Sequence, residues 1–123
     1  MAITRTYIGR AKYDFSIDGG AISAITPENN FTLPVGAMVI GAWTDVKTNM
    51  TSGGSATVAL AIGGVTIKGA TAFNNAAYTG IDYHLARTSA ALTTASGSVT
   101  FTVATAALTA GEVDIYVEYL LPD

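Results

Sequence analysis

Residues 106–120 read Ala106-Ala107-Leu108-Thr109-Ala110-Gly111-Glu112-Val113-Asp114-Ile115-Tyr116-Val117-Glu118-Tyr119-Leu120. From residue 112 onward the side chains alternate in character. The apolar parity comprises Val113, Ile115, Val117 and Tyr119. The other parity comprises Glu112, Asp114, Tyr116 and Glu118. Because successive side chains point to opposite faces of a strand, the alternation predicts a β-strand with one face in the core and an acidic face toward water.

Shorter runs of the same kind fill much of the chain, separated by Gly, Pro and Asn. Segments 57–62 and 98–103 alternate clearly, and Gly63-Gly64 predicts a hairpin leading into a strand at 65–68. One long strand or a strand pair is expected at 3–15, and further strands at 21–26, 31–33 and 37–46. A turn is expected at 34–36, and the linker at 104–110 has room for one helical turn. About eight antiparallel strands predict an all-β jelly-roll or Greek-key sandwich. An immunoglobulin-like sandwich is the alternative, although its Cys-Trp-Cys signature is missing.

Segment 69–95 has no clean period. We expect a long loop there, with short strands near 82–85 and 90–93. No segment has the apolar stripe of a helix of three or more turns. The length of 123 residues suits a single domain, 1–123, with an N-terminal strand or arm over about residues 1–15.

The composition favours a protein that associates with other protein surfaces. Hydrophobic residues make up 50% of the chain and charged residues only 12%, against a usual charged share of about 25%. A surface so poor in charge suggests that another subunit covers part of it. The net charge of −3 argues against nucleic-acid binding, which needs a basic surface to neutralise phosphates.

The sequence contains no signal for secretion. The N-terminal residues lack the apolar core of a signal peptide, so we expect synthesis in a cytoplasm. The most apolar run, 35–43, is too short to span a bilayer, and no membrane association is expected. Cysteine is absent, so no disulfide or thiolate chemistry is expected.

No residue pattern indicates catalysis, a cofactor or a metal. His84 is the only histidine, and neither a nucleophile motif nor a second imidazole accompanies it. Residues 14–19 faintly resemble a calcium loop but lack a closing Glu, so a turn is expected. Glu112, Asp114 and Glu118 lie on one strand face, on the same side as Tyr116. They could form half of a sugar cleft, yet a solvated or partner-facing strand explains them better. We therefore expect no enzyme and no small-molecule substrate.

The C-terminal stretch carries a resemblance as well as a pattern. Residues 107–120 resemble the ends of small virion proteins of tailed bacteriophages, which close on a motif like TAG-x-x-DVYVEYL. Residues 33–46, Leu-Pro-Val-Gly-Ala-Met-Val-Ile-Gly-Ala-Trp-Thr-Asp-Val, and residues 57–64, Thr-Val-Ala-Leu-Ala-Ile-Gly-Gly, are similar to the middle of such proteins. The resemblance covers about 33–62 and 99–120. It concerns the fold, so no functional residue transfers.

The resemblance implies a virion structural protein. Some of these proteins are jelly-roll head decoration, or cement, proteins, which sit as trimers on the capsid exterior and bridge major capsid subunits. We therefore expect a homotrimer made in the host cytoplasm, which binds the major capsid protein and stabilises the outer capsid surface. The apolar run predicts a subunit interface at Met38, Ile40 and Trp43. The basic residues near the N-terminus predict a capsid contact at Arg5, Arg10 and Lys12.

A second class of function is compatible with the same residues. Other proteins of this kind are fibre or tail-tip components, which implies a receptor- or sugar-binding module of a phage fibre, spike or tail tip. An aromatic side chain beside carboxylates, such as Tyr116 with Glu112 and Glu118, is the feature that would mark a sugar site.

Overall fold

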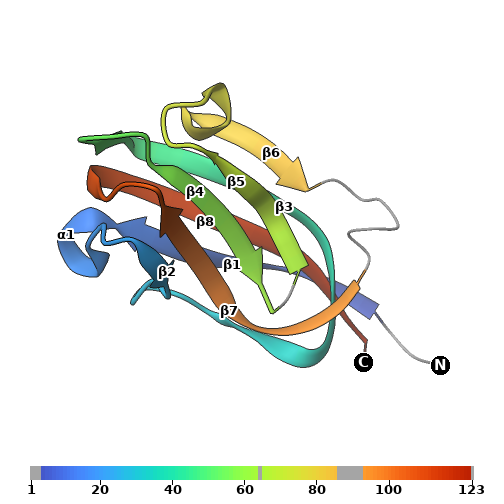
Figure 1. Ribbon diagram of the computed structural model, residues 1–123. Helices are drawn as coiled ribbons and strands as arrows, with labels where there is room; N and C mark the ends of the chain where they lie inside the picture. The colour runs from blue at the N-terminus through green and yellow to red at the C-terminus, as the bar shows by residue number, and fades with distance from the viewer. Residues whose placement is uncertain (1–3, 64, 86–92, 123) are drawn as a thin grey trace.

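The fold is built almost entirely of strands. The computed structural model describes residues 4–63, 65–85 and 93–122 (Figure 1). Its strands are β1 (Thr4–Asp14), β2 (Ser23–Ile25), β3 (Thr32–Ser52), β4 (Thr57–Ile62), β5 (Val65–Ala72), β6 (Ile81–Leu85), β7 (Thr93–Ala104) and β8 (Leu108–Pro122). The helical elements in the described ranges are one turn of α-helix, α1 (Phe15–Asp18), and the 3₁₀ turn η1 (Ala76–Tyr78).

The strands form two layers joined at a corner. One layer has the order β1-β8-β3-β6 and the other the order β2-β7-β4-β5, and all of these pairs are antiparallel. The beginning of β3 also pairs with the beginning of β7, which connects the layers into one eight-stranded network. In Figure 1, β7 and β4 cross in front of β8 and β1. The prediction of an all-β antiparallel sandwich is confirmed.

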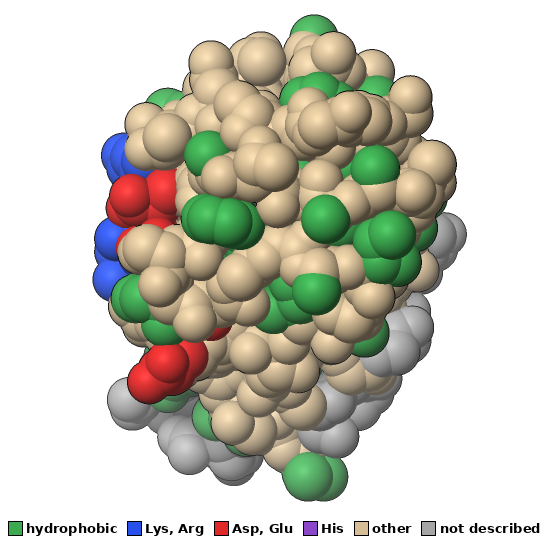
Figure 2. Space-filling model, turned by 60° about the vertical axis from the view of Figure 1, so that its left-hand side comes forward, with side chains coloured by type: hydrophobic (Ala, Val, Ile, Leu, Met, Phe, Trp, Pro, Cys, Tyr) green, Lys and Arg blue, Asp and Glu red, His purple; other side chains and the backbone are tan. Residues whose placement is uncertain are grey.

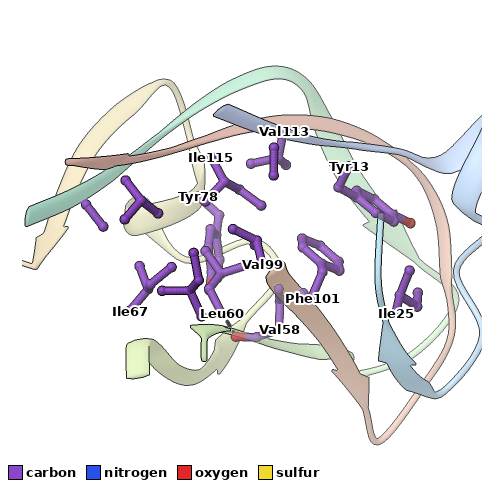
Figure 3. Close-up of a cluster of buried hydrophobic side chains, with 14 of the residues drawn as sticks. Tyr13, Ile25, Val58, Leu60, Ile67, Tyr78, Val99, Phe101, Val113 and Ile115 are labelled. Atoms are coloured by element: carbon purple, nitrogen blue, oxygen red, sulfur yellow. Dashed lines mark hydrogen bonds between the residues drawn. The ribbon is translucent and has the colours of Figure 1, made fainter. Parts of the chain in front are cut away.

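The core lies between the two layers and is closed by aromatic side chains. Tyr13 of β1 stacks on Phe101 of β7 with ring centroids 4.0 Å apart and planes 4° apart, so this contact spans the layers (Figure 3). Tyr78 of η1 is 1% exposed and donates a hydrogen bond of 3.0 Å to the Val58 carbonyl. Burial of each such side chain contributes about 1.5–3 kcal/mol, which makes these rings central to stability.

The clearest sequence patterns match the structure. In β8, Val113, Ile115 and Val117 are fully buried, as the alternation predicts. Tyr119 is half-buried and stacks on Tyr7 of β1 at 5.6 Å. The strand predicted at 57–62 is β4, with alternate residues buried, and the hairpin after it leads into β5.

The turn predicted at residues 34–36 is wrong. β3 continues through it from Thr32 to Ser52, and the register of β3 against β7 shifts between Leu33 and Ala37. Pro34 has no N–H for a ladder hydrogen bond, and Gly36 has a φ of +90°. A bulge accommodates both residues without ending the strand, because it leaves extra residues unpaired.

Two linkers also differ from expectation. The segment expected to be a long loop, 69–95, contains the end of β5, η1, and β6, which agrees with the short strand predicted near 82–85. Most of the strand predicted near 90–93 lies outside the described residues. The linker at 104–110 has no helical turn, since β8 already begins at Leu108 and Thr105 has a φ of +73°.

Gly111 is the glycine of β8 whose replacement we expect to be costly. Its φ is +145°, and an added Cβ would lie 2.6 Å from Cγ of Met50, which is buried in β3. Gly111→Ala should lower the free energy of unfolding by about 2 kcal/mol or more, since it combines backbone strain with overpacking. Denaturant unfolding measures this. Gly53→Ala, where no atom lies within 4 Å of the added Cβ, should have little effect, and equal losses in both variants would contradict the account.

The buried tyrosines predict instability at alkaline pH. Burial raises the pKa of Tyr13 to about 12 and also raises the pKa of Tyr78. Because the pKa in the folded state lies above the unfolded value of about 10, these tyrosine hydroxyls stay protonated to a higher pH in the folded state than in the unfolded state. These groups should therefore leave the free energy of unfolding unchanged below pH ~10 and lower it between pH ~10 and ~12. Denaturant midpoints measured across this range test the prediction. In Tyr78→Phe the free energy of unfolding should fall less steeply with pH, and an equally steep fall in that variant would contradict the prediction.

Candidate interaction surface

The outer face of the β1-β8-β3 layer collects the polar and aromatic residues of three strands. The strand register places Arg10 of β1 opposite Tyr116 of β8, and Tyr116 opposite Trp43 of β3. The next row is Lys12, Asp114 and Asp45. The mixed-charge face, as it is called below, comprises Arg10, Lys12, Trp43, Asp45, Lys47, Glu112, Asp114, Tyr116 and Glu118.

An aromatic pair lies at the middle of the mixed-charge face. The rings of Trp43 and Tyr116 stack with centroids 5.5 Å apart and planes 14° apart. Side chains that are directly opposite in an antiparallel pair approach closely, which explains why these residues from distant parts of the sequence are in contact. Both are half-buried, so part of this aromatic surface remains accessible.

Two ion pairs flank the aromatic pair. Lys12 Nζ lies 2.6 Å from Glu112 Oε1, and Lys47 Nζ lies 2.6 Å from Asp45 Oδ2. The hydrogen bond to Glu112 raises the pKa of Lys12, and the hydrogen bond to Asp45 raises the pKa of Lys47. Exposed ion pairs contribute little to stability, so these contacts mainly fix which carboxylates the two ammonium groups reach.

Asp114 is the unusual member of the mixed-charge face. Its side chain is buried, with the residue 4% exposed, and its Oδ1 has no hydrogen-bond partner among the described residues. Asp45, another carboxylate, lies directly across the ladder from it. Burial of a carboxylate oxygen without a hydrogen bond is costly, and like charges on opposite strands repel. The ammonium groups of Lys12 and Lys47 attract the Asp114 carboxylate and offset part of this cost.

The burial of Asp114 corrects one expectation. Sequence alternation predicts that the polar parity of the last strand faces water throughout, but β8 is an inner strand with β1 on one side and β3 on the other. Asp114 lies between Lys12 of β1 and Asp45 of β3 in the strand register and is 4% exposed. Alternation contains no signal for this, because it does not reveal which residues lie across the ladder.

The structure brings together part of the two predicted contact sets. Arg10, Lys12 and Trp43 share the mixed-charge face. Arg5 lies at the start of β1, opposite Leu121, and its side chain lies outside the described set. Ile40 is the extra residue at the register shift between Val39 and Gly41 and is 2% exposed, so it has little surface for a partner.

Met38, the remaining residue of the predicted subunit interface, is half-buried and pairs with Leu120 at the far end of β8. The subunit interface and the capsid contact both stay predictions.

Asp14 and Asp18, which lie in the segment considered as a calcium loop, have structural roles at α1. Asp14 caps α1 by accepting hydrogen bonds from the Ser16 N–H and hydroxyl, and these bonds lower the pKa of Asp14. Asp18 accepts hydrogen bonds from the backbone N–H of Asp14 and of Glu28, which holds the expected turn together. His84 lies in β6, and its side chain is outside the described set.

Neither a metal centre nor a membrane-spanning helix is found in the described parts of the chain. Residues 4–63, 65–85 and 93–122 contain no group of three or more His, Asp or Glu side chains arranged to hold a metal ion. The same residues contain no helix long and apolar enough to cross a membrane.

Charge is unevenly distributed over the molecule. Figure 2 shows Lys, Arg, Asp and Glu side chains along one edge of the view, while the rest of that view is hydrophobic or uncharged. In β4 and β7 of the second layer, the side chains on the parity opposite to the core are small and uncharged: Thr57, Ala59, Ala61, Ser98, Thr100 and Thr102. β5 of the same layer carries Lys68 on this parity. The mixed-charge face is thus distinct in chemistry from the rest of the sandwich.

Comparison with known proteins finds similarity in structure. No protein-family model matches the sequence, and no curated protein matches it either. The fold is similar to a chain of the cyanophage Pam1 capsid asymmetric unit, with a TM-score of 0.61 and 25% sequence identity over 96% of this chain and 86% of that chain. It is also similar to a chain of the capsid of Ralstonia phage GP4, with a TM-score of 0.52 and 18% identity over 92% of this chain and 83% of that one.

The burial of Asp114 gives a prediction about stability. Asp114→Asn removes a buried charge and its repulsion with Asp45, so the free energy of unfolding should rise by about 1 kcal/mol. Thermal and denaturant unfolding measure the change. Glu28→Gln alters the net charge equally at an exposed loop position and should leave stability unchanged. Loss of stability in Asp114→Asn would contradict the account of Asp114.

Proposed function

We propose that this chain is a non-enzymatic structural protein of a bacteriophage virion, and specifically a capsid decoration protein. In this role it oligomerises and binds the outer capsid surface through the major capsid protein. The observation that carries the proposal is the likeness to a chain of the cyanophage Pam1 capsid, which extends over 96% of this chain at 25% identity. The C-terminal resemblance to phage virion proteins supports it independently of the fold.

The physical properties of the chain fit such a role. The outward side chains of β4 and β7 are small and uncharged, and the chain has few charges in total, which favours contact with other proteins. A protein that binds only the assembled lattice stabilises that lattice by its binding free energy. In a closed ring of three subunits, each subunit forms the same interface with its neighbour, and the ring presents three capsid contacts at once.

The oligomeric state is the first test of the proposal. In size-exclusion chromatography with light scattering, a homotrimer should have a molar mass three times the chain mass of 12.6 kDa. Met38→Ala should weaken the trimer if the predicted interface is correct. A monomer at micromolar concentration would contradict the trimer, and an unchanged trimer in Met38→Ala would contradict the interface at this residue.

Capsid binding is the second test. The purified protein should co-sediment with mature capsids that lack it, from the phage whose genome encodes this chain. It should also raise the temperature at which those capsids release DNA. Bovine serum albumin at the same concentration serves as the negative control. Failure to co-sediment with any capsid form would contradict a decoration role.

One observation favours a second function, a sugar- or receptor-binding module of a fibre, spike or tail tip. The stacked rings of Trp43 and Tyr116 lie next to the acidic residues of β8, and aromatic rings beside carboxylates are a common setting for sugar binding. Glycan-array binding that is lost in Tyr116→Ala, with no capsid co-sedimentation, would favour this alternative. Capsid binding without glycan binding would exclude it.

A further inference from the structure

The buried carboxylate of Asp114 points to a ligand that the isolated chain does not supply. Its Oδ1 has no hydrogen-bond partner within the described residues, although Asp114 is only 4% exposed. Lys12 hydrogen-bonds Glu112 and Lys47 hydrogen-bonds Asp45, each at 2.6 Å, so both ammonium groups attract the Asp114 carboxylate through space but neither donates a hydrogen bond to its Oδ1. A cation with hydrogen-bond donors would stabilise this carboxylate, and it reaches Oδ1 when the side chains that cover the atom move aside.

The charges of the mixed-charge face favour one further cation. Its carboxylates are Asp45, Glu112, Asp114 and Glu118, and its cations are Arg10, Lys12 and Lys47. Four negative charges against three positive ones leave one negative charge in excess, and Asp14 adds another at the margin of the face. A positively charged side chain from a partner complements this surface.

The aromatic neighbours select the kind of cation. Tyr116 is two residues from Asp114 on the same face of β8, and Trp43 stacks on Tyr116. An arginine guanidinium is planar, stacks on aromatic rings and bonds a carboxylate with parallel N–H donors. A lysine ammonium lacks this planar surface. A bare metal ion would need additional ligands, and the described residues contain no such cluster.

We propose that the mixed-charge face binds an arginine side chain of the major capsid protein, with the guanidinium stacked beside Trp43 and Tyr116 and bonded to Asp114. This inference rests on the proposed decoration function and specifies its contact. It also assigns Asp114 a role that explains its cost to the isolated chain, because the binding partner supplies the missing hydrogen bonds. Arg10 and Lys12, predicted from sequence as the capsid contact, border the arginine site. The proposal assigns Trp43 to the capsid contact as well, in place of the subunit interface predicted from sequence.

A direct binding test needs no capsid. Trp43 is the only tryptophan, so its fluorescence reports on this face alone. Titration of the full chain with N-acetyl-arginine methylamide should give a saturable change, and N-acetyl-lysine methylamide should bind more weakly. Asp114→Asn should lower the affinity for the arginine probe by about tenfold, because the variant loses a charge-assisted hydrogen bond. Glu28→Gln is the matched control and should bind as the parent does.

Each result of the titration decides the proposal. A saturable arginine response that Asp114→Asn weakens supports it. No saturable response, an equal response to the lysine probe, or an equal response in Asp114→Asn overturns it. If Asp114→Asn does not fold, the comparison of the two probes on the unsubstituted chain still supports or overturns the arginine site.

Capsid co-sedimentation then separates this inference from the proposed function. Capsid binding by the unsubstituted chain and by Glu28→Gln, with about tenfold weaker binding by Asp114→Asn, supports the arginine contact. Equal capsid binding by all three overturns the contact while the decoration function stands. No capsid binding by the unsubstituted chain contradicts the function, and the fluorescence titration still tests the arginine site. Loss of the oligomer in Asp114→Asn would assign the face to a second copy of this chain and overturn the capsid partner.

Discussion

The fold depends on the pairing of β8 on both of its edges. β1 pairs with it from Thr4–Pro122 to Asp14–Glu112, and β3 pairs with it from Met38–Leu120 to Ser52–Leu108. A strand held on both sides has a fixed register, so every side chain of β8 is assigned to one face. One face supplies the fully buried Val113, Ile115 and Val117, and the other supplies the centre of the mixed-charge face.

The same pairing links stability to interaction. The inner face of β8 contributes favourable burial of apolar surface, whereas its outer face holds a carboxylate whose Oδ1 has no hydrogen-bond partner among the described residues. Proteins tolerate such a cost where a site serves binding, because partner contacts restore what the free protein lacks. The strong core contributed by β8, Tyr13 and Phe101 allows the outer face to retain this unfavourable group.

The low overall charge has a structural counterpart in how the charges are placed. The outward residues of β4 and β7 are small and uncharged, while β1, β3 and β8 carry the ion pairs of the mixed-charge face. Two surfaces of different chemistry on one sandwich suit a protein that contacts more than one kind of partner surface. This division is compatible with the decoration function proposed above.

Local sequence was sufficient to predict the strand class and the parity of the core. Alternation in 57–62, 98–103 and 112–119 predicts which side chains are buried, because a strand has a period of two residues whatever lies beside it. Alternation did not predict the bulge at 34–36 or the extra residue Ile40, since unpaired residues in a bulge leave no period. The stacking of Trp43 on Tyr116 and the burial of Asp114 beneath its neighbours emerged only from the folded chain. Those contacts join residues about seventy positions apart through strand register, which local sequence does not encode.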